Sequence, residues 1–390
     1  MTKPESITAV LSRLLDYCQS RDWAGVDPYD ALNSQWLTSS PILDRRLPRL
    51  CLTQCLKRSP VDFRALLRIH PTQNPKALAL FLSAFVKMKR IGLLRDRQLV
   101  DEMIRRLKES HSPGQDRYCW GYSFPWQTRT VLVPRGAPNL VSTVFAANAF
   151  LDVYQALHDR SCLELALDAA HYVHELYWED GGRAGFAYPE PNSKMGVHNA
   201  NFLGAALLCR IDRICHEPKL AEAGIAAARY SATRQSPNGS WAYSDRQPWI
   251  DHFHTGYNLC ALNSIIADTG SAEFEPVLRR GFQYYRNTFF REDGAPKYFS
   301  NRTYPIDIHC VAQSLITLTT LQKLDCGGKP QPQSILNWAL KHLHDPQGYF
   351  YYQAYPFWKI RTAYMRWSQA WMALALATIL EESHQRAAIS

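Results

Sequence analysis

The chain has 390 residues, of which 46% are hydrophobic and 20% charged, and this composition excludes wholesale disorder. Its formal net charge is +9, carried in short clusters, and no nucleic-acid-binding module is recognisable, so we expect no nucleic-acid partner. The excess of positive charge favours an anionic substrate, an acidic glycan, a phosphate or a membrane surface instead.

The sequence shows no targeting segment, and no apolar run approaches the roughly 18 residues that span a bilayer. The ten cysteines are scattered, mostly within apolar helical runs, and form no CxxC pair. No HxxxH or HxxE pair would lie on one helix face, so we expect no metal site and no other cofactor. These features predict a cytoplasmic protein with reduced thiols.

The N-terminal residues 1–70 predict a helix at about 5–20 and a second helical stretch at about 45–69, broken near Pro60. After them, one pattern recurs about every 55 residues, and such periodicity indicates a repeat architecture. Each repeat holds an amphipathic helix, a turn such as Glu179-Asp180-Gly181 or Glu292-Asp293-Gly294, a loop rich in aromatic residues, and a more apolar helix.

The apolar helices are expected to be buried because they are apolar on most faces. They are predicted at about 74–86, 138–154, 198–211, 252–266, 308–321 and 366–380. The amphipathic helices, which show one face to water, are predicted at about 95–110, 161–177, 217–233, 272–288 and 330–343.

This alternation predicts an all-α fold of the (α/α)6 toroid type, a closed ring of helical hairpins with an inner and an outer ring of helices. Short β-hairpins are expected in the loops, around 131–133 and 349–352. No Gly/Ser-rich linker divides the chain. We therefore expect a single domain, 1–390, in which residues 1–70 either close the ring or extend it.

The inner helices of such a ring all begin at the same end, so the residues at their starts would line one mouth of a central cavity. Two consecutive repeats place an Asp shortly before a His there, Asp251 with His254 and Asp307 with His309, and a third repeat places His198 there. An Asp bonded to an imidazole fixes its tautomer and raises its basicity, as acid/base catalysis requires. These five residues are the candidate catalytic residues. The alternative is that each Asp caps its helix and each His packs on the first turn.

The same mouth would receive aromatic residues, which suit sugar rings, carbocations or isoprenoid chains, and arginines, which suit carboxylate or phosphate. The candidate substrate-binding residues are Trp120, Tyr122, Arg129, Asn199, Asn201, Trp249, His252, Tyr304, Tyr364 and Arg366. For any one aromatic residue, packing between repeats is the structural alternative.

Distinctive motifs run along nearly the whole chain. They include Asp27-Pro28-Tyr29-Asp30, Asn74-Pro75-Lys76, Trp120-Gly121-Tyr122, Val197-His198-Asn199-Ala200-Asn201, Tyr304-Pro305-Ile306-Asp307-Ile308-His309 and Tyr364-Met365-Arg366-Trp367. Together they resemble a family of proteins encoded in bacterial polysaccharide-biosynthesis clusters. The resemblance implies a glycan context and specifies no reaction.

At the level of the fold, the chain is similar to two groups of toroids. One contains the terpenoid cyclases and prenyltransferases: Gln235-Ser236-Pro237-Asn238-Gly239-Ser240-Trp241 resembles the Gln/Trp repeat of triterpene cyclases, although Asp307 lacks the neighbouring acids of their Asp-rich motif. The other contains polysaccharide lyases and uronate C5-epimerases, which use His, Tyr and Arg in a toroid cleft.

Three functions follow as hypotheses. The first is an enzyme that acts on an anionic, uronate-type glycan or its lipid-linked precursor by C5 epimerisation or β-elimination, with His254 and His309 as acid and base and with Arg129 or Arg366 neutralising the carboxylate. The second is a terpenoid-cyclase-like enzyme on an isoprenoid substrate, with Asp307 as acid. The third is a non-catalytic scaffold of a polysaccharide synthase complex. The expected partners are an anionic glycan or lipid-linked sugar, the synthase machinery and a membrane surface.

Overall fold

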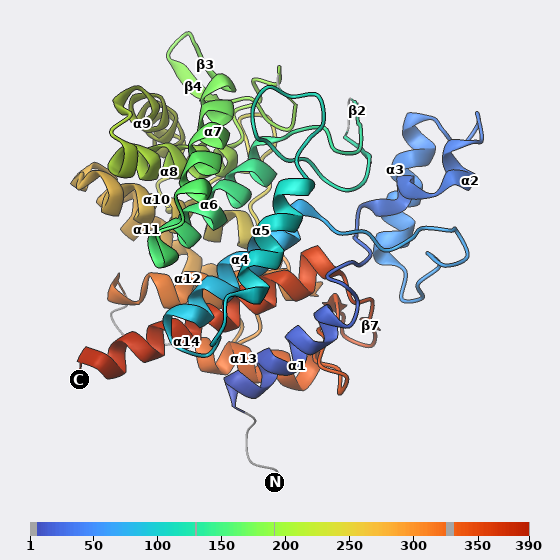
Figure 1. Ribbon diagram of the computed structural model, residues 1–390. Coiled ribbons are helices and arrows are strands. Elements are labelled where there is room, and N and C mark those ends of the chain that lie inside the picture. The colour runs from blue at the N-terminus through green and yellow to red at the C-terminus, as the bar shows by residue number, and fades with distance from the viewer. Residues whose placement is uncertain (1–5, 129–130, 191, 325–330, 390) are drawn as a thin grey trace.

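The computed structural model describes residues 6–128, 131–190, 192–324 and 331–389, and it confirms the all-α toroid (Figure 1). Six helices among these residues form the inner ring, and each contacts the next until the last returns to the first. In ring order they are α4 (Pro75–Arg90), α6 (Leu140–Leu157), α8 (His198–Cys215), α10 (His252–Thr269), α12 (Ile308–Thr320) and α14 (Trp371–Ile389).

One amphipathic helix covers each inner helix from outside. In the same order the outer helices are α5 (Gln98–Glu109), α7 (Arg160–Glu175), α9 (Pro218–Thr233), α11 (Glu275–Thr288), α13 (Pro332–His342) and α1 (Ile7–Gln19). Helix α1 packs on α14, so the N-terminal helix supplies the outer partner of the C-terminal one and the ring needs no terminal cap.

Asn and Asp side chains begin several of the inner helices. Asn74 caps α4, Asn139 caps α6, Asp251 caps α10 and Asp307 caps α12, each through a side-chain oxygen that accepts a backbone N–H of the first turn. This capping satisfies donors that a helix start leaves unpaired. It also places a polar residue at the same end of each of these helices.

Residues 34–68 leave the ring and form a separate segment, which we call the arm (Figure 1). It follows the short turn η1 (Asp30–Asn33) and carries α2 (Gln35–Thr38) and α3 (Arg46–Arg58). A small apolar cluster packs Leu56 of the arm against Ala31 and Ile69, which flank it in the sequence.

The remaining elements are short. The strands form three small antiparallel sheets: β1 (Trp126–Gln127) with β2 (Leu132–Val133), β3 (Tyr177–Asp180) with β4 (Arg183–Phe186), and β5 (Ile306–Asp307), β6 (Gln353–Ala354) and β7 (Lys359–Ile360) in one sheet. The hairpin expected around 131–133 is present, whereas the strand expected at 349–352 begins just after it, at Gln353. The turns η2 (Ala272–Phe274) and η3 (Gln322–Leu324) lie between helices, and the π-helix η4 (Met365–Ala370) leads into α14.

Helix α6 departs from one expectation drawn from the sequence. By length and composition alone it is apolar enough to cross a membrane, although the sequence analysis found no such run. Its apolar stretch is 61% buried inside the ring, between α4 and α8. We therefore interpret it as a core helix of the toroid.

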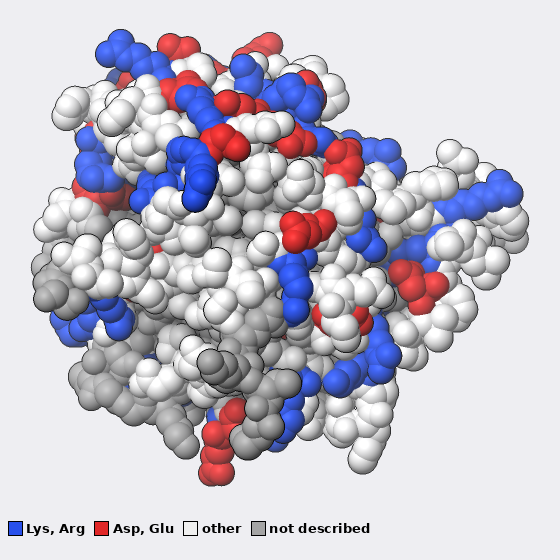
Figure 2. Space-filling model, turned by 60° about the horizontal axis from the view of Figure 1, so that its bottom comes forward, with Lys and Arg blue, Asp and Glu red and all other residues white. Residues whose placement is uncertain are grey.

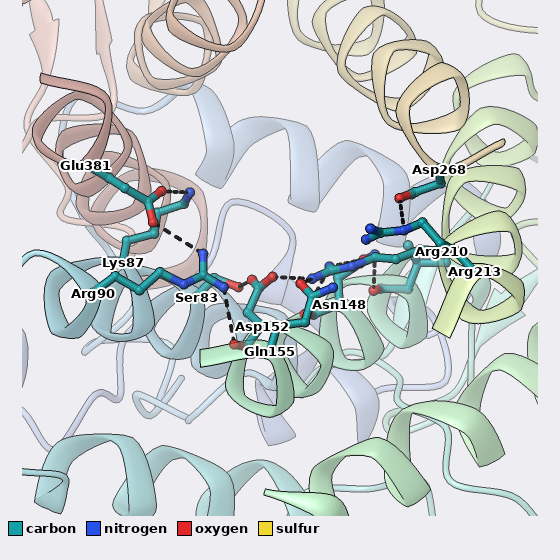
Figure 3. A network of polar contacts seen from close by, with 11 residues as sticks. Ser83, Lys87, Arg90, Asn148, Asp152, Gln155, Arg210, Arg213, Asp268 and Glu381 are labelled. Carbon is teal, nitrogen blue, oxygen red and sulfur yellow. Dashed lines mark hydrogen bonds and ion pairs between the residues drawn. The ribbon is translucent and has the colours of Figure 1, made fainter. Parts of the chain in front are cut away.

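Charged side chains join the inner helices at the end of the ring where these helices finish (Figure 3). Lys87 and Arg90 of α4 both pair with Glu381 of α14, and Asp152 of α6 pairs with Arg210 of α8 at 2.7 Å. A second cavity of about 450 Å³ lies among these residues. Each of these cations already has an acidic partner, so the network joins helices of the inner ring at this end.

Candidate functional site

A cavity of about 860 Å³ lies at the opposite end of the ring, where the inner helices begin. The second residue of each inner segment lines it. These residues are Lys76, Val141, Asn199, Phe253, His309 and, from η4, Arg366. Since a helix turns by about 100° per residue, the first residue of each segment faces elsewhere. Register within the first turn therefore decides which polar side chains reach the cavity.

Asp251 holds the imidazole of His254 on the cavity wall. Its Oδ2 lies 2.7 Å from Nδ1 of His254, and its Oδ1 accepts the backbone N–H of His254 at 3.0 Å. A carboxylate only accepts hydrogen bonds, so Nδ1 carries a proton, and in the neutral imidazole the lone pair then lies on Nε2. Nε2 has no hydrogen-bond partner among the described residues, and the side chain is 22% exposed. The arrangement is that of an oriented general base.

His309 also lines the cavity, and its partner is Tyr257. Its Nε2 lies 2.6 Å from the Tyr257 hydroxyl. Burial lowers the pKa of His309 well below its usual value, and the charges of Lys76 and Arg366 lower it further. Burial likewise raises the pKa of Tyr257 well above 10. At neutral pH the pair is therefore a neutral imidazole and a protonated phenol, which can donate or relay a proton.

The pairing expected between Asp307 and the His309 imidazole is not formed. Asp307 Oδ1 accepts the backbone N–H of His309 at 2.8 Å and Nε1 of Trp367 at 3.0 Å, and its Oδ2 accepts Nε2 of Gln353 at 2.7 Å. The reason is spacing: His254 stands three residues after its cap, whereas His309 stands two after it and turns into the cavity. Asp307 does not line the cavity, and burial raises its pKa to about 6.

Lys76 presents an amine to the cavity without a polar partner. Its side chain is buried, and its Nζ makes no hydrogen bond or ion pair among the described residues. Three rings surround it, with Nζ 4.2 Å from the centroid of Phe145, 5.2 Å from Trp371 and 5.5 Å from Tyr257. Burial lowers the pKa of Lys76 well below 10.5, and the nearby Arg366 lowers it further. An anionic partner would stabilise the protonated form of this amine.

Arg366 lines the cavity but is already paired. Its Nε and Nη2 donate to the two carboxylate oxygens of Asp27 at 2.7 and 2.8 Å, and both side chains are buried. Its guanidinium also lies 5.0 Å from the ring of Tyr122. The ion pair balances the charge of Arg366. A substrate carboxylate that binds Arg366 would therefore share the guanidinium with Asp27.

Aromatic rings complete the wall. Trp249 stacks on Tyr243 with their centroids 5.0 Å apart, and Tyr122 stacks on Phe124. Phe253 lies between the two imidazoles, 4.2 Å from that of His254 and 4.7 Å from that of His309. Among the predicted binding residues, Tyr122, Asn199, Trp249 and Arg366 therefore line the cavity.

The other predicted histidines, His198 and His252, face the outer ring. They are the first residues of α8 and α10. Nδ1 of His198 lies 3.2 Å from Ser231 Oγ on α9, and Nε2 of His252 lies 3.0 Å from the Tyr285 hydroxyl on α11 and 2.9 Å from Ser314 Oγ. Burial lowers their pKa values to about 4 and about 3. These residues join helices and do not line the cavity.

Asn201 and Trp120, both predicted to bind substrate, are buried in the framework instead. Asn201 Oδ1 accepts the backbone N–H of Phe186 at 2.9 Å, and Trp120 Nε1 donates to the carbonyl of Leu107 at 2.7 Å. Each side chain thus satisfies a buried polar group of the chain itself. This leaves neither of them on the cavity wall.

Tyr304 and Tyr364 are also outside the cavity lining. The hydroxyl of Tyr304 accepts Nη1 of Arg291 at 3.3 Å, and Tyr364 is buried with its ring edge-on to Tyr352, at a centroid distance of 4.8 Å. Arg129, predicted to neutralise a carboxylate, lies outside the described residues.

Several residues of the cavity wall were not among the predicted site residues, and three of them, Lys76, Tyr257 and Tyr243, contact the proposed site. Lys76 occupies the same register as His309, and aligning the second residues of the repeats would have selected it. Tyr257 lies one helical turn beyond Phe253 on the same face. Tyr243 has no comparable signal, because it comes from a loop. No group of three or more His, Cys, Asp or Glu able to hold a metal ion occurs in the described part of the chain.

Comparison with known proteins gives similarity at the level of the fold. No protein-family model matches the chain, and no curated protein matches it. Among solved structures, a cellobiose 2-epimerase from Bacillus thermoamylovorans B4167 superposes with a TM-score of 0.64 at 11% identity, over 82% of this chain and 90% of that one. A family 76 α-mannanase from Bacteroides thetaiotaomicron gives 0.61 at 12% identity, over 83% and 89%. A polysaccharide lyase gives 0.58 at 8% identity, over 98% and 97%.

Proposed function

We propose that this protein is a carbohydrate-active enzyme that removes and returns a proton at a sugar carbon. Its substrate would be an anionic, uronate-type glycan or the lipid-linked precursor of one, and the reaction C5 epimerisation or β-elimination. One observation carries the proposal: the Asp251–His254 pair and the Tyr257–His309 pair, from neighbouring repeats, line the same cavity.

The two pairs suit the two halves of such a reaction. Nε2 of His254 takes the proton from C5, and Asp251 stabilises the imidazolium that forms. The electrons of the C5–H bond pass into the uronate carboxyl group as an enediolate. Return of a proton to C5 from the Tyr257 hydroxyl, which His309 holds in place, gives the epimer. Solvent then takes the proton from His254 and returns one to Tyr257. Loss of the substituent at C4, protonated by Tyr257, gives the unsaturated sugar instead.

The carboxylate needs a cation to make C5–H acidic, and Lys76 fits this role. Its amine has no polar partner among the described residues, whereas Arg366 is balanced by Asp27. An arriving carboxylate would raise the pKa of Lys76 towards its usual value and hold it as an ammonium. Arg366 would add its remaining N–H groups.

The fold neighbours support a carbohydrate substrate, since they include epimerases, mannanases and a lyase that act on sugars. The motif resemblance noted in the sequence supports a place in polysaccharide biosynthesis, in contact with the synthase machinery. The terpenoid-cyclase hypothesis requires Asp307 as the acid. Asp307 does not line the cavity, and its oxygens accept hydrogen bonds from Gln353, Trp367 and a backbone N–H, so this hypothesis has no acid in the cavity.

The test is deuterium incorporation. Purified protein is incubated in D₂O with uronate-containing polysaccharides, and C5 exchange is followed by NMR while unsaturated uronate is followed by ultraviolet absorbance. We expect one of these signals, and a loss of about 10²–10⁴-fold in His254→Gln. If neither signal is seen over a range of pH, and if His254→Gln leaves polymer output in the host unchanged, the protein is a scaffold instead.

A second candidate is epimerisation at C2 of a neutral sugar. The observation that favours it is that Asp27 balances the charge of Arg366 while burial lowers the pKa of Lys76, so these two buried basic side chains offer a carboxylate little positive charge. The same D₂O experiment with neutral disaccharides separates the two, because exchange would then occur at C2 and would not require Lys76.

A further inference from the structure

Large hydrophobic side chains are exposed on one part of the molecule. Of those exposed among the described residues, all but Leu93 belong to the arm or to the β1–β2 and β6–β7 hairpins. On the arm they are Trp36, Ile42, Leu43, Leu47, Val61, Phe63 and Leu66, and on the hairpins they are Val131, Leu132, Phe357 and Trp358. Phe357 is 98% exposed and Ile42 74%. Apolar exposure concentrated in this way marks an interaction surface.

The three elements belong to one rim. Arg49 of α3 donates from Nη1 to Oε1 of Gln127 in β1 at 3.2 Å, which ties the arm to the first hairpin. The second hairpin pairs through β6 with β5, which leads into α12, whose His309 lines the cavity. The rim borders the cavity, because Leu50, Thr53 and Gln54 of α3 and Trp126 and Gln127 of β1 line it.

Positive charge accompanies the apolar side chains. The arm contains Arg45, Arg46, Arg49, Lys57, Arg58, Arg64 and Arg68 against only Asp44 and Asp62, a net charge of +5 out of +9 for the chain. Figure 2 shows basic side chains on the projecting part of the molecule. Arg45, Arg46 and Arg58 are exposed and form no ion pair among the described residues. They remain available to an external anion.

We propose that the arm and the two hairpins dock the protein on an anionic lipid membrane. The apolar side chains would enter the boundary between headgroups and acyl chains, and the free arginines would bind the anionic headgroups, which is how amphipathic basic segments hold a membrane surface. Docking in this way turns the cavity mouth towards the lipid headgroups. The binding itself does not depend on the proposed chemistry.

Flotation with lipid vesicles tests the proposal. The full chain is mixed with vesicles of phosphatidylcholine alone or with phosphatidylglycerol, at low and high salt. We expect binding to the anionic vesicles that weakens as salt rises. The triple variant Arg45→Gln/Arg46→Gln/Arg58→Gln should bind on the order of 100-fold more weakly, since each basic residue near an anionic surface contributes about a fivefold step. A matched control, Lys108→Gln/Arg160→Gln/Lys219→Gln, removes three exposed charges from the outer helices and should bind as the unaltered chain does.

A second variant separates insertion from charge. Ile42→Ser/Leu47→Ser/Phe357→Ser keeps every arginine and should also lose most binding, and far-ultraviolet circular dichroism checks that each variant is folded. No binding of the unaltered chain to anionic vesicles, or binding by the arginine and serine variants as tight as that of the unaltered chain, would overturn the proposal. So would a dimer that forms without lipid and disappears in the serine variant, because that result assigns the rim to a second copy of the chain.

Discussion

Oδ2 of Asp251 lies 2.7 Å from Nδ1 of His254, while Oδ1 of the same carboxylate caps helix α10. One side chain therefore begins the helix and sets the tautomer of the base, so its structural and chemical roles can be separated by substitution.

Asp251→Asn should lower activity with little change in stability. Asn caps helices as well as Asp does, so the free energy of unfolding should change by less than about 1 kcal/mol. Its amide, however, can donate to Nδ1 and move the imidazole proton to Nε2, which removes the base. We expect a loss of about 10²–10⁴-fold in the C5 exchange rate, measured beside thermal unfolding. Asp159→Asn, which alters the cap of outer helix α7, is the control, and equal losses in the two variants would contradict the assignment.

Tyr257→Phe should separate proton removal from proton return. His254 can still take the proton from C5 and exchange it with D₂O, so deuterium wash-in should persist. Inversion or elimination should fall by about 10²-fold or more, because the hydroxyl that donates is missing. Comparing wash-in with product formation by NMR gives the result, and a parallel loss of both would argue against Tyr257 as the acid.

Lys76→Met should raise KM for the uronate substrate and leave exchange on neutral sugars unchanged. The variant should also be more stable at neutral pH, by about 1 kcal/mol or more, since a buried amine without a partner costs free energy. The pKa of Lys76 is lower in the folded than in the unfolded chain, so the unfolded state binds the extra proton and stability rises with pH towards 10.5. The stability gain of Lys76→Met should therefore shrink as pH approaches 10.5, which urea unfolding at several pH values would detect.

His252 should make the fold sensitive to acid. Its pKa is lowered to about 3 by burial, against 6.5 in the unfolded chain, so only the unfolded state takes up a proton between these values. Its contribution is present above pH 6.5 and declines as pH falls, by about 2 kcal/mol at pH 5. Urea unfolding of His252→Gln should show a flatter pH dependence between 7 and 5. An unchanged slope would contradict the pKa shift.

The buried Arg366–Asp27 pair yields a stability prediction. Asp27→Asn leaves the guanidinium charge buried without its partner and should cost about 3–5 kcal/mol of unfolding free energy. Asp27→Asn/Arg366→Met removes both charges and should cost less than the single variant. Denaturant unfolding measures both, and a larger loss in the double variant would show that Arg366 stabilises the fold through other contacts.

The sequence located features that depend on neighbours along the chain. The recurring helices predicted the ring, and the spacing of Asp251 and His254 predicted their contact, because three residues are one turn of helix. The same reasoning failed for Asp307 and His309, where the spacing is one residue shorter, and for His198, which occupies the register of His252 rather than that of His254.

The sequence alone therefore determined the class of fold, the end of the ring that carries the polar helix starts, and the Asp251–His254 pair, since each follows from local hydrogen bonding and helical periodicity. Only the tertiary structure decided that Tyr257 meets His309 across 52 residues and Asp27 meets Arg366 across 339. It also decided that α1 covers α14 and that the arm stands at the cavity mouth. These contacts depend on how each helix is rotated about its axis when the ring closes, which no local pattern of residues encodes.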